Sequence, residues 1–178
     1  AQISKQNQYI NNFKQAETVL FVFPLYTDCM PFNVKNFFEL LYNETFERKN
    51  VGFIVQSGFP EAHHSIFLEK YLKKLTIAIG CNYLGTIIKG GVEGIQMMPP
   101  SMTKKLFGQF ELLGKKFTEK GVFDEALKQK LASPMKMSKL NLFFFKLISK
   151  TGLTNYYWNT NLKKNNAFEK RFDRPYKN

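Results

Sequence analysis

The sequence contains few of the residues that mark secreted, membrane-spanning or metal-binding proteins. Its 178 residues include two cysteines, two histidines and one tryptophan. Cys29 and Cys81 are 52 positions apart, which is neither a metal-binding spacing nor a disulfide framework and indicates a reducing compartment. No segment approaches the roughly 18 uncharged apolar residues of a membrane span, and the first residues have no signal-peptide pattern. These absences predict a soluble, cytoplasmic protein.

Acidic residues are scarce as well: 14 Asp and Glu stand against 26 Lys and Arg, for a net charge of +12. The excess is uneven. Residues 134–178 hold ten Lys and Arg against two acids, or +8, so that residues 1–133 carry only +4. A basic terminal segment bears on partners rather than on fold. We therefore predict one domain, residues 1–133, followed by a basic and aromatic-rich C-terminal extension, residues 134–178.

Apolar residues make up 44% of the chain and follow alternating helical and strand patterns. These patterns predict helices at residues 4–15, 32–42, 64–79 and 101–121, and strands at 18–23, 51–56 and 82–89. Strand 18–23 is apolar at nearly every position, which is typical of a strand buried on both faces. On helix 64–79, a helical wheel assigns one apolar side to Phe67, Tyr71, Leu72, Leu75 and Ile79. Strands that alternate with such helices indicate an α/β fold with a parallel sheet.

Each predicted strand is followed directly by a loop with turn residues. Pro24 to Pro31 follows the first strand, Ser57-Gly-Phe-Pro-Glu follows the second, and Gly90-Gly-Val-Glu-Gly follows the third. Open α/β sheets bind their ligands outside the carboxyl ends of their strands. We therefore expect a functional site where these loops meet.

Residues 17–31 read Glu-Thr-Val-Leu-Phe-Val-Phe-Pro-Leu-Tyr-Thr-Asp-Cys-Met-Pro, and Val-Lys-Asn-Phe-Phe-Glu follows from residue 34. This stretch resembles the NAD(P)H-dependent FMN reductase family of flavodoxin-like proteins, whose third strand ends in a Pro-x-Tyr loop followed by Met-Pro and a helix. Residues 51–61 and the strand before Gly90 are similar to the fourth and fifth strands of that family. The resemblance covers about residues 10–121. It implies a flavodoxin-like, doubly wound parallel sheet with a helical C-terminal extension.

The resemblance also implies a function and a site. The chain would be an oxidoreductase that passes hydride from NAD(P)H through bound FMN to a small-molecule electron acceptor. One side of the isoalloxazine ring would contact Pro24, Leu25, Tyr26, Thr27 and Met30, and its other edge would contact Ser57, Gly58 and Phe59. Because the hydride chemistry would reside in the flavin, we expect no catalytic side chain. Read from the residues alone, the same loops are also consistent with simple turns that close the core.

The chain departs from the family on its N-terminal side. The family begins with a strand and a Ser- and Gly-rich loop that holds the FMN phosphate at a helix N-terminus. This sequence has no such strand or loop, and it begins with Ala rather than Met. Strand 18–23 would then be a sheet edge, which is an aggregation hazard. Three explanations are open: further residues upstream, a partner chain that covers the edge, or a reorganised fold; we favour the first.

The departure keeps a second function open, namely a non-enzymatic flavodoxin-like binding or scaffold protein that uses its basic tail for a membrane or protein partner. Residues 135–150 predict a basic amphipathic helix, with lysines at 136, 139, 146 and 150 on one side. This helix either makes a weak contact with a membrane surface or packs its aromatic side on the domain or on a second subunit. The family resemblance favours a homodimer.

Two further expectations concern ligands. The tail from Lys163 onward is basic but carries no recognised nucleic-acid motif, so we expect no nucleic-acid partner. His63 and His64 are adjacent and lack the i,i+4 spacing that brings two side chains to one helical face. We expect them to be surface residues at the start of a helix and assign no metal site.

Overall fold

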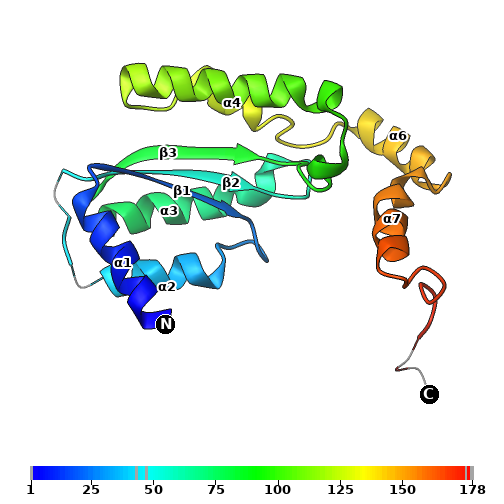
Figure 1. Cartoon of the computed structure of the whole chain (residues 1–178). Coiled ribbons are helices and arrows are strands. Elements are labelled where there is room, and N and C mark those ends of the chain that lie inside the picture. Colours follow the sequence, from blue (N-terminus) through cyan, green and yellow to red (C-terminus); the bar gives the residue numbers. More distant parts are fainter. Residues whose placement is uncertain (1, 43, 47, 175, 177–178) are drawn as a thin grey trace. The chain divides into compact units, whose positions relative to one another are not determined.

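The computed structural model describes residues 2–42, 44–46, 48–174 and 176 (Figure 1). These residues form two compact units, Ala1–Lys136 and Met137–Asn178. We treat each unit by itself.

The first unit alternates helices and strands. Its α-helices are α1 (Gln2–Gln15), α2 (Phe32–Leu41), α3 (Ile66–Ala78), α4 (Pro100–Lys120) and α5 (Glu125–Leu131). Its strands are β1 (Thr18–Pro24), β2 (Asn50–Gln56) and β3 (Asn82–Lys89), and two 3₁₀ turns are η1 (Ala62–Ser65) and η2 (Ile95–Met97). The predicted order of elements is confirmed as far as α4. The short helix α5 was not predicted.

The three strands form one parallel sheet in the order β1-β2-β3. Thr18 pairs with Asn50, which pairs in turn with Asn82 on β3. Helices α1, α2 and α3 lie on one face of the sheet and α4 lies on the other (Figure 1). The predicted α/β class with a parallel, doubly wound sheet is therefore confirmed, and β1 is an edge of the sheet that the described residues form.

Two apolar clusters hold the sheet between its helices. The larger cluster, on the α1–α3 side, is rich in phenylalanine; for example, the rings of Phe21 and Phe53 stack with centroids 5.7 Å apart. The smaller cluster, under α4 and α5, contains Ile87, Leu113, Phe123, Leu127 and Leu131. Aromatic pairs of this kind contribute about 0.5–1.5 kcal/mol beyond their buried area. Packing of the phenylalanines therefore fixes α1 and α2 on β1.

Two predictions about burial are wrong. On β1 the side chains alternate, and Leu20 and Val22 are 40% and 65% exposed, because the smaller cluster gathers on β2 and β3 and does not extend over β1. On α3, Phe67 and Tyr71 are exposed while Leu68 and Leu72 are buried. The helix is thus turned relative to the side that the wheel assigned, and its buried side includes Leu68 and excludes the two aromatic residues.

The second unit contains α6 (Lys139–Ser149), the 3₁₀ turn η3 (Leu153–Asn155) and α7 (Tyr156–Lys164). Ser138 begins α6, since its hydroxyl oxygen accepts a hydrogen bond from the backbone N–H of Asn141 at 3.2 Å. The predicted helix 135–150 is confirmed in its central part but begins later, so Lys136 lies outside it. None of the described helices is both long enough and apolar enough to cross a membrane.

Candidate functional site

Backbone hydrogen bonds connect the three loops at the carboxyl ends of the strands. The N–H of Leu25 donates to the carbonyl of Gln56 at 2.7 Å, and the N–H of Ser57 donates to the carbonyl of Lys89 at 3.0 Å. The N–H of Gly91 donates to the carbonyl of Phe59 at 2.8 Å. We call these connected loops, residues 24–31, 57–61 and 90–94, the strand-end rim. It lies where the sequence predicts a site.

The loop after β1 contains a tight turn. Tyr26 and Cys29 exchange two backbone hydrogen bonds of 2.9 Å each across Thr27 and Asp28. Both central residues have positive φ, +46° at Thr27 and +61° at Asp28, as in a type I′ turn. Positive φ at a β-branched residue is a genuine outlier, and such outliers concentrate at functional sites. The turn therefore marks this loop as a candidate site on grounds independent of the sequence pattern.

The residues predicted to contact the flavin lie in the first two loops of the rim and differ in exposure. The rings of Tyr26 and Phe59 are 62% and 63% exposed, and Thr27 is exposed as well. Pro24, Leu25, Ser57 and Gly58 belong to the same connected backbone. Met30 is different: it is 5% exposed, belongs to the apolar core and lines a cavity of about 120 Å³ with Phe38 and Tyr71. All eight predicted residues thus lie in two connected loops, and the side chains of Met30 and Ser57 are buried there.

Close packing between the second and third loops explains Gly90. A Cβ atom on Gly90 would lie 2.5 Å from the carbonyl oxygen of Phe59, so a side chain there would push the loops apart. Gly58 faces the carboxylate of Glu93, which ends a flexible side chain. Ser57 is buried, and its hydroxyl donates to the carbonyl of Phe59 at 3.0 Å. These contacts hold the exposed Phe59 ring on a fixed backbone.

Lys89 is the last residue of β3 and lies beside the rim. Of the three described strands, β3 is the one that ends in a cationic residue. Lys89 is partly buried, and burial lowers the pKa of its ammonium group. Its backbone carbonyl accepts the hydrogen bond from Ser57 described above.

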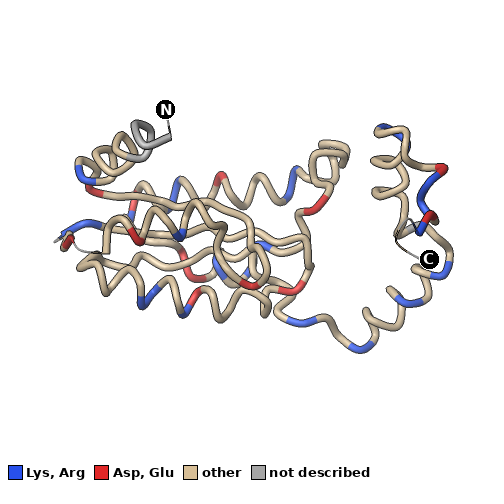
Figure 2. Tube along the Cα trace, turned by 90° about the horizontal axis from the view of Figure 1, so that it is seen from below, with Lys and Arg blue, Asp and Glu red and all other residues tan. Residues whose placement is uncertain are grey.

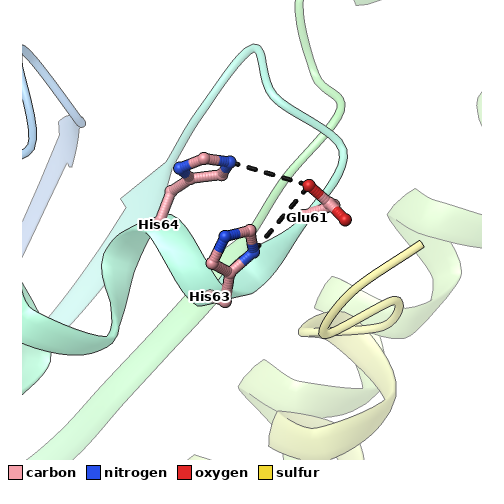
Figure 3. A group of neighbouring side chains, drawn as sticks. All are labelled: Glu61, His63 and His64. Atoms are coloured by element: carbon pink, nitrogen blue, oxygen red, sulfur yellow. Dashed lines mark ion pairs between the residues drawn. The ribbon is translucent and has the colours of Figure 1, made fainter.

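Glu61, at the end of the second loop, lies beside both histidines of the chain (Figure 3). Its Oε2 is 3.8 Å from Nδ1 of His63 and 3.7 Å from Nε2 of His64. Both histidines lie just before α3, as expected for residues at the start of a helix, and both approach the same carboxylate oxygen. The residues form the 3₁₀ turn η1 rather than regular α-helix, and the two rings lie 4.1 Å apart between centroids. In the sequence, only the closely spaced pattern Glu-x-His-His at residues 61–64 indicates this cluster.

A larger cavity, of about 560 Å³, lies at the start of α4. It is lined by residues of η2 and the first turns of α4, including Gln96, Ser101 and Lys104. Its volume is within the range of about 300–1,000 Å³ that ligand pockets occupy. None of the residues predicted to contact a flavin lines it.

The chain is thus an α/β protein with a parallel sheet, with a strained and partly aromatic rim at the carboxyl ends of the strands. No protein-family model matches it, and no curated protein matches it. Among solved structures, it is similar to a Trp repressor binding protein from Bacillus subtilis, at 15% identity and a TM-score of 0.44, over 48% of this chain and 62% of that chain. It is also similar to an NADPH-quinone reductase from P. pentosaceus, at 14% identity and a TM-score of 0.45, over 72% of this chain and 74% of that chain. The chain spans less than two thirds of the first of these proteins.

Proposed function

We propose that this chain is a flavodoxin-like oxidoreductase that binds FMN at the strand-end rim and passes hydride from NAD(P)H to a small-molecule electron acceptor. The observation that carries the proposal is the placement of two exposed aromatic rings, Tyr26 and Phe59, on hydrogen-bonded loops at the edge where open sheets bind ligands. The resemblance of residues 17–31 to the FMN reductase family supports it. Bound FMN would supply the hydride-transfer chemistry.

The residues of the rim fit the ring of the cofactor. A flat aromatic ring needs apolar and aromatic surface together with polar backbone at its edge. Tyr26 and Phe59 offer that surface, and the strained turn at Thr27 fixes the backbone between Tyr26 and Cys29. Held on a fixed backbone, these groups lose little conformational entropy when a ligand binds. Their role is to bind and orient the ring.

The phosphate of FMN has no comparable cradle among the described residues. The only glycine-rich loop, residues 90–94, follows β3 and packs against Phe59 and Pro60. A phosphate group bound at a helix N-terminus normally contributes both hydrogen bonds and favourable charge interactions. We therefore expect the chain by itself to bind FMN weakly and to oxidise NAD(P)H only when FMN is added.

Titration of the protein with FMN, followed by quenching of flavin fluorescence, tests the proposal. Tyr26→Ser and Phe59→Ser are each expected to weaken binding by up to about tenfold, since one ring contact contributes about 0.5–1.5 kcal/mol. Tyr9→Ser and Tyr42→Ser are matched controls, because both rings are exposed and belong to α1 and to the C-terminal end of α2, outside the rim loops. Equal loss in all four variants, or no saturable binding to the unaltered chain, contradicts the proposal.

The second unit favours a second candidate function, a binding or scaffold role. Within this unit the apolar side chains of α6 are all exposed, between 42% and 64%: Leu140, Leu142, Phe143, Phe144, Phe145, Leu147 and Ile148. Lys139 and Lys146 lie on one side of the helix, and Lys150 follows at its end, within an arc of about 40° at 100° per residue. Figure 2 shows the basic residues along this part of the chain. A basic helix with exposed aromatic residues suits an anionic membrane surface.

Co-sedimentation with lipid vesicles tests this second function. Binding to vesicles with anionic lipid, with little binding to neutral vesicles, is the expected result, and Phe144→Ser or Lys146→Glu should weaken it. Equal binding to both kinds of vesicle contradicts an electrostatic contact. A chain that binds vesicles but neither binds FMN nor oxidises NAD(P)H would favour the binding role over the proposed oxidoreductase. The resemblance to the FMN reductase family also favours a homodimer, and sedimentation velocity would measure whether the chain forms one.

A further inference from the structure

The only two histidines of the chain converge on one carboxylate. His63 and His64 approach Oε2 of Glu61 from two sides, with His63 presenting Nδ1 and His64 presenting Nε2 (Figure 3). One ligand atom from each of the three residues lies within 4.8 Å of the other two. Imidazole nitrogen and carboxylate oxygen are the ligands that Zn²⁺ accepts in sites of mixed composition. The cluster therefore has the right donor atoms in one place.

The distances within the cluster suit an ion better than hydrogen bonds. The two N···O separations, 3.8 Å and 3.7 Å, exceed the 2.7–3.2 Å of an N–H···O hydrogen bond. Ligand atoms about 2.0–2.1 Å from a tetrahedral zinc ion are roughly 3.4 Å apart. The two N···O separations are therefore only about 0.3–0.4 Å longer than that spacing.

The burial of His63 is a second observation that favours a bound cation. Its Nδ1 is buried and has no hydrogen-bond partner among the residues that the structure describes. A buried polar atom without a partner costs about 1–3 kcal/mol, and a bound cation would remove that cost. The side chains of Glu61, His63 and His64 are only 22%, 31% and 32% exposed, so the cluster is partly shielded from water.

The backbone beneath the cluster is fixed by the segment that follows α5. The N–H of Ala62 donates to the carbonyl of Pro134 at 3.0 Å, and the N–H of His63 donates to the carbonyl of Met135 at 3.2 Å. On the other side, the ring of Phe59 lies 4.9 Å from that of His64 between centroids. Ligands held in this way by neighbouring contacts lose little freedom when they bind a metal.

We propose that Glu61, His63 and His64 bind one Zn²⁺ ion through Oε2, Nδ1 and Nε2. Three protein ligands leave a fourth tetrahedral position for water or another small ligand, which is the arrangement of open rather than structural zinc sites. The site goes beyond the proposed flavin function and does not depend on it. Simple ion pairs between Glu61 and protonated histidines are the competing explanation, and these would bind no metal.

The test uses the full chain without a histidine tag and without FMN. Isothermal titration with Zn²⁺ should give one bound ion per chain. Glu61→Gln, His63→Ala and His64→Ala should each weaken binding by at least about tenfold, since loss of a group that only hydrogen-bonds to a metal ligand already costs about 10–100-fold. Glu119→Gln, an exposed carboxylate on α4, and Cys29→Ser, an exposed thiol, are the controls and should leave binding unchanged.

Substitution of Co²⁺ for Zn²⁺ identifies the ligands independently. Visible bands of a tetrahedral ion without the near-ultraviolet band of a thiolate ligand are the expected spectrum, and Glu61→Gln should abolish it. Far-ultraviolet circular dichroism checks that this nearly isosteric variant remains folded. No binding at one equivalent, unchanged binding in the three ligand variants, or a thiolate band overturns the proposal. Because no flavin is present, none of these outcomes depends on the proposed oxidoreductase function.

Discussion

Gly90 lies so close to the chain after β2 that a Cβ atom on it would be 2.5 Å from the carbonyl oxygen of Phe59. The same Cβ atom would be 2.6 Å from the carbonyl oxygen of Pro60. Both neighbours are backbone atoms, so a flexible side chain cannot move aside to make room. The spacing of the second and third loops of the strand-end rim therefore depends on glycine at position 90.

Gly90→Ala is expected to lower the free energy of unfolding by about 1–3 kcal/mol, the usual cost of overpacking. It should also weaken FMN binding, because it displaces Phe59. Gly114→Ala is the matched control: nothing lies within 4 Å of its Cβ position inside α4, and the change should stabilise the protein by about 0.5–1 kcal/mol. Urea unfolding measures both. Equal stability of the two variants would contradict the close packing.

Thr27→Gly is expected to stabilise the protein by about 1 kcal/mol. Thr27 has a φ of +46°, which glycine adopts without the steric cost that a β-branched residue meets. The control is Thr118→Gly on α4, where helical backbone makes glycine less favourable than threonine by roughly 0.3 kcal/mol. The two changes should therefore shift the urea midpoint in opposite directions. A loss of stability in both variants would show that the turn is not strained.

Lys49→Met is expected to destabilise the protein by about 2 kcal/mol. The ammonium group of the buried Lys49 donates to the backbone carbonyls of Lys14 and Ala16 at the end of α1, and it lies 5.2 Å from the centroid of the Phe13 ring. Hydrogen bonds from a charged donor contribute about 1.5–3 kcal/mol, and a cation favours a helix C-terminus. Lys73→Met, an exposed lysine on α3, should change stability by less than about 0.5 kcal/mol.

The sequence predicts the main order of elements because the apolar patterns of β1, α2 and β2 are strong. It does not predict α5, which has seven residues and too few turns to show a helical period. Its start is nevertheless encoded, since a carboxylate oxygen of Asp124 accepts a hydrogen bond from the N–H of Leu127 at 3.0 Å. The buried side of α3 is not predictable either. A helical wheel shows two overlapping apolar sides, one that includes Phe67 and one that includes Leu68, and does not indicate which of them is buried.

The candidate site is predictable in its location and less so in its detail. Parallel strands bring their carboxyl ends to one edge, so the meeting of three loops follows from the fold class. The burial of Met30 does not, because it depends on how α2 and α3 pack. The convergence of His63 and His64 on Glu61 depends on a 3₁₀ turn, for which α-helical spacing rules do not hold.

Tyr83 should make the stability of the first unit depend on pH under alkaline conditions. Burial is the main cause that raises the pKa of Tyr83 to about 12; its hydroxyl also forms a hydrogen bond of 2.7 Å with that of Thr86, which acts in the opposite direction. In the unfolded chain the phenol ionises near pH 10. Between about pH 10 and 12 the unfolded state therefore binds fewer protons than the folded state, and the free energy of unfolding falls as pH rises.

This contribution is fully present below about pH 10 and is lost as the pH rises through about 12. Lysines also ionise in this range, so the test compares Tyr83→Phe with the unaltered chain in urea unfolding at several alkaline pH values. Tyr83→Phe loses the hydrogen bond to Thr86 at every pH, but its stability should fall less steeply above pH 10. Tyr9→Phe, at an exposed tyrosine on α1, should keep the slope of the unaltered chain. Identical slopes in all three proteins would show that Tyr83 ionises as readily in the folded state as in the unfolded one.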